Sequence, residues 1–145
     1  MSATGLHTLD DAPRVVGIWL EELREAVGFE DTQRSYNLLR TVLHTLRDWL
    51  STDEAAQLSA QLPMLMRGIY FEGWNPSQTV SRPRGKPEFI KRIDTAFEEA
   101  PLHDTDACVS AVFALLERHV SSGEMRDVMG SMPKDLKPLF SQALD

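Results

Sequence analysis

Residues 42–74 read VLHTLRDWLSTDEAAQLSAQLPMLMRGIYFEGW, and this stretch decides the fold. Its pattern is a helix, a capped break, a second helix, a proline and a third helix that ends in aromatic residues. Ser51 and Glu54 have the spacing of a capping box, which starts a new helix directly after the preceding one. Pro63 ends that helix, because a proline disfavours helical geometry in the residue before it, and then opens the next helix.

The same plan recurs later in the chain. A shift of 70 residues carries Ser51 onto Ser121 and Pro63 onto Pro133. The apolar positions keep this register, with Val42, Leu46, Met66 and Ile69 falling on Val112, Leu116, Leu136 and Leu139. We therefore predict two similar four-helix units that pack on each other, because neither unit would bury its apolar stripe well alone.

Apolar residues at three- and four-residue steps predict an all-α fold, a compact bundle of about eight helices built from two pseudo-repeated four-helix units. The predicted helices are 13–27, 32–50, 52–61, 63–71, 86–99, 105–120, 122–130 and 133–143. Asp10 or Asp11 is expected to cap the first helix, with Pro13 in its first turn. Residues 1–12 are predicted to be a flexible tail and residues 13–145 a single domain. The two pseudo-repeated units of this domain, residues 13–72 and 86–143, are joined by a Gly- and Pro-rich loop at 73–85.

Composition limits the classes of function. The chain has 145 residues, 42% of them apolar, and a net charge of -7, which disfavours binding to nucleic acid or to anionic membranes. Cys108 is the single cysteine, so no internal disulfide can form, and no Cys–His cluster predicts a metal site or a cofactor. The N-terminal residues lack the pattern of a signal peptide, so a cytoplasmic protein is expected, either a monomer or a weak homodimer.

Two runs carry a family resemblance, LHTLRDWL at residues 43–50 and QLPMLMRGIYFEGW at residues 61–74. They resemble a bacterial family catalogued as domain of unknown function 2267. RHVSSGE at residues 118–124 and MPKDL at residues 132–136 are similar to the closing pattern of that family, with Met132 where leucine is usual. The resemblance covers about residues 14–142 and implies a small, soluble, all-helical bacterial protein. It brings no catalytic residue with it.

Positions that differ between the two predicted units are the candidates for function. The main set is Arg67, Tyr70 and Trp74, with the loop bases Arg82, Arg84 and Lys86. Arginine can grip a carboxylate in a two-pronged contact, so this set predicts a binding site for a protein partner or a small anionic ligand stacked on Trp74. The alternative is that Trp74 packs over the core while the bases stay solvated.

His44 is a second candidate, with Asp48 one helical turn further on as a possible orienting carboxylate. No nucleophile motif accompanies it, and a local hydrogen bond at the helix edge is the alternative. Asp104 is expected to cap the helix at 105–120, and Cys108 to be a small core residue. The favoured hypothesis is therefore a non-enzymatic binding or protein-interaction module. The alternative is a small enzyme that uses His44 or Arg47 in a pocket at the seam between the units.

Overall fold

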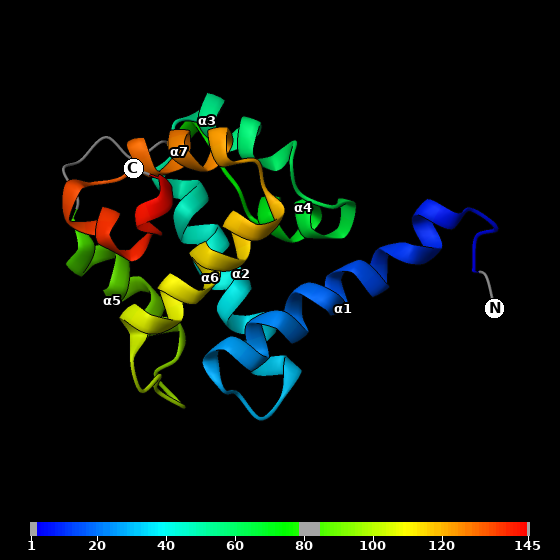
Figure 1. The fold of residues 1–145 in the computed structure, drawn as a ribbon, viewed down its shortest axis with the longest axis horizontal. Coiled ribbons are helices and arrows are strands. Elements are labelled where there is room, and N and C mark those ends of the chain that lie inside the picture. The colour runs from blue at the N-terminus through cyan, green and yellow to red at the C-terminus, as the bar shows by residue number, and fades with distance from the viewer. Residues whose placement is uncertain (1–2, 79–84, 145) are drawn as a thin grey trace.

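A computed structural model describes residues 3–78 and 85–144, and Figure 1 shows their arrangement. Within these residues the structure contains helices and no strand, so the all-α prediction is confirmed. The α-helices are α1 (His7–Val27), α2 (Thr32–Trp49), α3 (Thr52–Ser59), α4 (Met64–Phe71), α5 (Lys86–Ala96), α6 (Thr105–His119) and α7 (Ser122–Gly130). Three short 3-10 helices complete the chain: η1 (Pro76–Gln78), η2 (Lys134–Leu139) and η3 (Gln142–Leu144).

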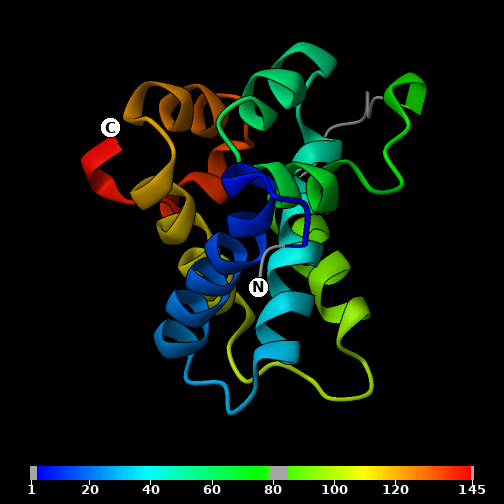
Figure 2. The same ribbon diagram turned by 90° about the vertical axis from the view of Figure 1, so that its right-hand side faces the viewer.

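Helices α2 and α6 lie at the centre, and the other elements pack around them (Figures 1 and 2). Helix α1 lies against α2 and α6, and α5 lies against the same two helices. Helix α3 packs on α7, while α4 packs on α2 as η2 packs on α6. The two pseudo-repeated units stay a prediction.

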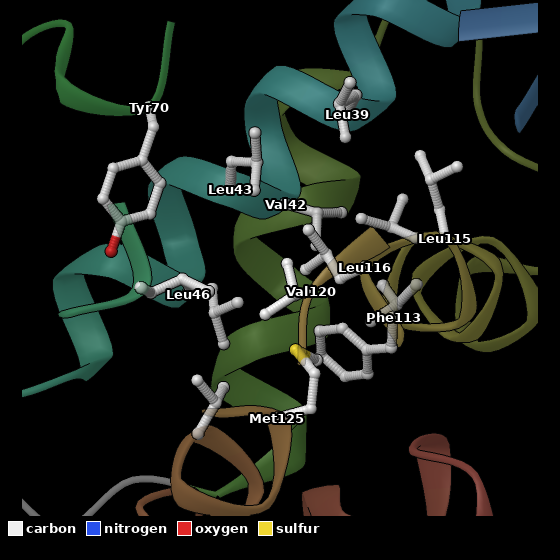
Figure 3. Packing of buried hydrophobic residues seen from close by; sticks show 14 of the residues in the cluster. Leu39, Val42, Leu43, Leu46, Tyr70, Phe113, Leu115, Leu116, Val120 and Met125 are labelled. Carbon is white, nitrogen blue, oxygen red and sulfur yellow. The ribbon is translucent and has the colours of Figure 1, made fainter. Parts of the chain in front are cut away.

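The core fills the space between α2 and α6, as Figure 3 shows. Its fully buried members include Leu39, Val42, Leu43 and Leu46 from α2 and Phe113, Leu115 and Leu116 from α6. Burying one side chain of this kind contributes about 1.5–3 kcal/mol to folding. The apolar stripe predicted for residues 32–50 is therefore the surface that holds α2 against the second half of the chain.

Serine caps begin α3 and α7, as the sequence predicts. Ser51 Oγ accepts a hydrogen bond from Glu54 N at 3.1 Å, and Ser121 Oγ accepts one from Glu124 N at 3.2 Å. The reciprocal half of a capping box differs from the expectation, because Oε2 of each glutamate is buried and finds no hydrogen-bond donor among the described residues. The caps place the two helices correctly, and the glutamates are left facing the protein interior.

Helix α1 begins at His7, so the predicted start at residue 13 is wrong. Pro13 lies inside the helix, and Leu6 is the N-cap. Asp10, predicted as a possible cap of a later start, instead accepts hydrogen bonds from Thr4 N at 3.0 Å and Thr4 Oγ1 at 2.8 Å. These bonds stabilise the first turn of α1. They offset the loss of the intrahelical hydrogen bond that Pro13 cannot donate, because proline has no N–H.

The end of the chain also differs from the prediction. A single helix was expected over residues 133–143, but η2 and η3 are short 3-10 helices separated by two residues, the extended Phe140 and Ser141. Pro138 lies within η2 and has no N–H to donate, and in an α-helix its ring would clash with the carbonyl of Lys134. The tighter 3-10 geometry is used in short pieces of this kind.

Candidate functional site

The C-terminal end of α4, where the sequence placed its site, is held by side chains of α2. His44 Nε2 lies 2.7 Å from Ile69 O. Arg47 Nη1 donates to Tyr70 O at 2.9 Å and to Glu72 O at 2.8 Å. A helix leaves its last carbonyls without partners inside the helix. His44 and Arg47 therefore serve as caps for α4.

Arg47 is buried, with only 4% of its surface exposed. Its Nε donates to Asp48 Oδ1 at 2.8 Å, and Asp48 Oδ2 accepts from Arg92 Nη2 at 2.7 Å. Burial opposes ionisation of Asp48, but the hydrogen bonds from the two arginines outweigh it and lower the pKa of Asp48. The buried guanidinium is therefore paired with an ionised carboxylate.

Two titratable side chains of this junction are kept neutral. Burial lowers the pKa of His44, and the nearby Arg47 lowers it further, against the hydrogen bond to Ile69 O. Because a carbonyl oxygen can only accept, the proton of the neutral ring is on Nε2. Burial raises the pKa of Tyr70 well above its usual value, and the Tyr70 hydroxyl donates to Ala55 O at 2.9 Å. Tyr70 thus ties α4 to α3.

The other predicted site residues have local partners too. Arg67 donates from Nε to Ser59 O at 2.9 Å and from Nη2 to Leu62 O at 3.1 Å, which fixes the turn between α3 and α4. The half-buried Trp74 ring lies 5.0 Å from the Phe71 ring. Arg82 and Arg84 lie outside the described residues.

Lys86 is separate from this junction. Its Nζ lies 2.5 Å from Asp106 Oδ2, which ties the start of α5 to the first turn of α6. The structure thus gathers His44, Tyr70 and Trp74 around the end of α4. A binding role for the predicted set stays a prediction.

The seam between the two halves, where the enzyme hypothesis puts its pocket, is filled with apolar side chains from α2 and α6 (Figure 3). Four cavities have volumes between about 290 and 750 Å3, and His44 and Arg47 line none of these four. Over the described ranges no three acidic, histidine or cysteine side chains come together as metal ligands. The same ranges contain no helix with the length and apolar content of a membrane span.

Two neighbouring elements, α1 and α4, carry the exposed apolar side chains. In the described part of the chain, the large apolar residues that are exposed are Leu6, Leu9, Ile18, Met64 and Leu65, with exposed fractions from 39% to 59%. Three belong to α1 and its cap, and two to α4, which packs on α1. The first part of α1 projects away from the bundle (Figure 1), and we call its residues 6–18 the α1 arm.

A groove of about 750 Å3 lies in the angle between the α1 arm and the start of α4. Ala12, Val15 and Met64 give it apolar walls, and Asp10 and Asp11 add carboxylates. The hydrogen bond from Arg14 lowers the pKa of Asp11, which is therefore ionised at neutral pH. The groove combines an apolar wall with an acidic edge, an arrangement suited to an apolar segment that also carries basic residues.

Sequence reasoning missed this surface, although the sequence contained a signal. Met64, Leu65 and Met66 are consecutive, and successive residues of a helix point in directions about 100° apart. They cannot all face the core. Met66 is fully buried, whereas Leu65 is 43% exposed.

Comparison with known protein families gives one match over most of the chain. A family model described as "Uncharacterized conserved protein (DUF2267)" matches residues 17–139. No curated protein is significantly similar to the chain. The matched range contains α4 and most of α1, but it begins after the main part of the α1 arm.

Proposed function

The chain belongs to the DUF2267 family of uncharacterized conserved proteins, and from this premise we propose that it is a non-enzymatic binding module that docks a protein partner. The observation that supports this function is the concentration of exposed large apolar side chains on the α1 arm and α4. Contiguous apolar surface bordered by polar residues commonly marks an interaction site. The partner would lie in the groove beside Met64 and contact its apolar walls, Ala12, Val15 and Met64.

The chemistry of the groove favours one kind of partner, an amphipathic helix with an apolar face and flanking basic residues. A helix of this kind buries its apolar side chains in a groove, as in other helix-in-groove complexes. Asp10 lies where a basic residue would pair, while Asp11 is already ion-paired with Arg14. A second copy of the chain is less suitable, because its net charge of -7 would repel an equally acidic copy.

The test uses a synthetic helical peptide with leucine on one face and lysine on the other, followed by fluorescence anisotropy. Met64→Asn is expected to weaken binding about tenfold or more, because a buried methionine contributes about 1.5–3 kcal/mol. A peptide with glutamate in place of lysine is expected to bind less tightly. Equal binding of both peptides, or an unchanged affinity of Met64→Asn, would contradict the proposal.

The junction around Trp74 is the second candidate surface, and it would take a small anionic ligand or a partner carboxylate. It is supported by the partial exposure of Trp74 beside Phe71. Trp74→Ala separates the two surfaces in the same peptide assay. The groove proposal expects this variant to bind the lysine peptide unchanged, whereas a loss of binding to the glutamate peptide, which carries carboxylates, would support the Trp74 surface.

A further inference from the structure

A smaller cavity lies at the other end of α1, away from the α1 arm. Its volume is about 290 Å3, and its walls come from the end of α1, the start of α2 and the start of α6. Val27, Phe29 and Cys108 supply apolar surface, while Arg34 and Asp104 supply opposite charges. This size is near the lower limit for small-molecule sites, and a few well-placed polar groups in an apolar wall are typical of them.

Arg34 is held rigidly at the edge of this cavity. Its guanidinium carbon lies 5.0 Å from the centre of the Phe29 ring and 5.2 Å from that of the Phe97 ring, which are cation–π distances. Nη2 donates to Pro101 O at 3.1 Å. Nε and Nη1 have no hydrogen-bond acceptor among the described residues. The side chain is therefore a cation already in place, with two nitrogen donors, Nε and Nη1, available to a ligand.

Asp104 presents the opposite charge on the same cavity. It is the N-cap of α6, as the sequence predicts, and its Oδ1 accepts from Ala107 N at 3.0 Å. Over the described residues its Oδ2 receives no hydrogen bond. Burial, followed by the charge of Asp104, raises the pKa of the Cys108 thiol, so Cys108 contributes a neutral wall rather than a nucleophile.

We propose that this cavity binds a small zwitterion, an α-amino acid with a short aliphatic side chain. Its carboxylate would bind the free donors of Arg34, its ammonium group would bind Asp104, and its side chain would contact Val27 and Cys108. A simple anion would be repelled by Asp104, and a simple cation by Arg34, so a ligand with both charges matches the cavity better than either alone.

Three probes separate these possibilities: norvaline, pentanoate, which lacks the amine, and butylamine, which lacks the carboxylate. Binding is followed by changes in the amide NMR signals of Phe29, Ala107 and Cys108. Norvaline is expected to shift these signals, and each fragment to bind about tenfold more weakly, because a charge-assisted hydrogen bond contributes about 1.5–3 kcal/mol. Pentanoate or butylamine binding as tightly as norvaline would overturn the proposal, as would the absence of shifts at these amides.

Two variants test the assigned contacts. Asp104→Asn keeps the helix cap, because asparagine caps as well as aspartate, and removes only the charge. Arg34→Gln removes the cation, and Arg126→Gln, at an exposed position on α7, is the matched control. Both cavity variants are expected to weaken norvaline binding about tenfold, with the control unchanged. If Arg34→Gln does not fold, Arg34→Met, which also removes the cation, replaces it, and an unchanged affinity in either cavity variant would overturn the assignment.

Discussion

The segments that close the two halves of the molecule, α4 and η2, differ in structure although they occupy matching positions at the 70-residue offset. Helix α4 is a regular α-helix whose final carbonyls are bound by His44 and Arg47 of α2. Segment η2 is a 3-10 helix. Beside it Ser110 Oγ of α6 donates to Leu139 O at 2.8 Å, and Glu117 Oε1 accepts from Ser141 N at 3.0 Å.

Arg47 and Glu117 stand at matching positions and carry opposite charges. The end of an α-helix presents carbonyls, so it needs a donor such as arginine. The chain that leaves η2 presents an N–H at Ser141, so it needs an acceptor such as glutamate. Residues that differ between the halves therefore serve first to hold each closing segment. A functional role for them needs separate evidence.

The largest effect is expected for Arg47→Met. This change leaves the carbonyls of Tyr70 and Glu72 without their donor and Asp48 without its buried partner. Breaking a buried ion pair by removing one member costs about 3–5 kcal/mol. Urea denaturation of the purified variant measures this loss in the free energy of unfolding.

The matched change in the second half is Glu117→Gln, which keeps a carbonyl oxygen to accept from Ser141 N. It is expected to cost less than about 1 kcal/mol, because one partly exposed hydrogen bond is weakened rather than lost. If Arg47→Met and Glu117→Gln lower the free energy of unfolding by the same amount, the buried contacts of Arg47 do not stabilise α4 more than Glu117 stabilises the chain after η2.

Tyr70→Phe tests the next difference, because Phe140 is the matching residue and has no hydroxyl. The change leaves Ala55 O without its donor in a buried place, which is expected to cost about 1–2 kcal/mol. Thermal unfolding with Tyr36→Phe as control measures it, since Tyr36 is only half-buried. If Tyr70→Phe destabilises the protein no more than Tyr36→Phe does, the Tyr70 hydroxyl does not stabilise the first half.

Sequence alone predicted the elements that follow from local chemistry. The serine caps of α3 and α7 and the aspartate cap of α6 were predicted because a cap bonds to a residue only three positions away. The apolar stripe of α2 was predicted because its spacing is that of one helix face. The start of α1 could not be predicted in this way, since it depends on Thr4 bonding to Asp10 within the helix.

The candidate site was predicted less completely for a related reason. A charged residue beside an apolar stripe is expected to face water, and only the position of α4 shows that Arg47 has carbonyls to bind. His44 and Tyr70 were selected because they differ from their matching residues, Ala114 and Phe140. Their partners are the backbone carbonyl oxygens of Ile69 and Ala55, which a side-chain pattern cannot reveal.

Glu124 allows a test by pH, with Glu54 at the matching position of the first half as the comparison. Burial is the main cause that raises the pKa of Glu124, and the charges of Glu54 and Asp127 add to it. The folded protein therefore holds this proton more tightly than the unfolded chain does. Ionised Glu124 lowers stability above its folded pKa, and the loss disappears as the pH falls below the unfolded value of about 4.3.

Glu124→Gln is accordingly expected to stabilise the protein at neutral pH, by roughly 1 kcal/mol, because it replaces an unpartnered buried carboxylate with a neutral amide. The gain should vanish in acid. Melting temperatures at neutral and acidic pH measure it, and Glu54→Gln is the matched change on α3. A loss of stability of Glu124→Gln at neutral pH, or a gain that persists unchanged in acid, would show that the ionised carboxylate of Glu124 does not destabilise the protein.

The smallest effect is expected at Gly68, which matches Pro138 of η2. Gly68 is exposed within α4, and a Cβ added there would meet no atom within 4 Å. Gly68→Ala should therefore stabilise the protein by about 0.5–1 kcal/mol, since alanine loses less backbone freedom than glycine on forming a helix. Chemical denaturation measures this gain. A loss of stability would mean that the backbone of α4 has to leave helical geometry at Gly68. The peptide assay on Gly68→Ala would then test whether this flexibility is needed for binding in the groove beside Met64.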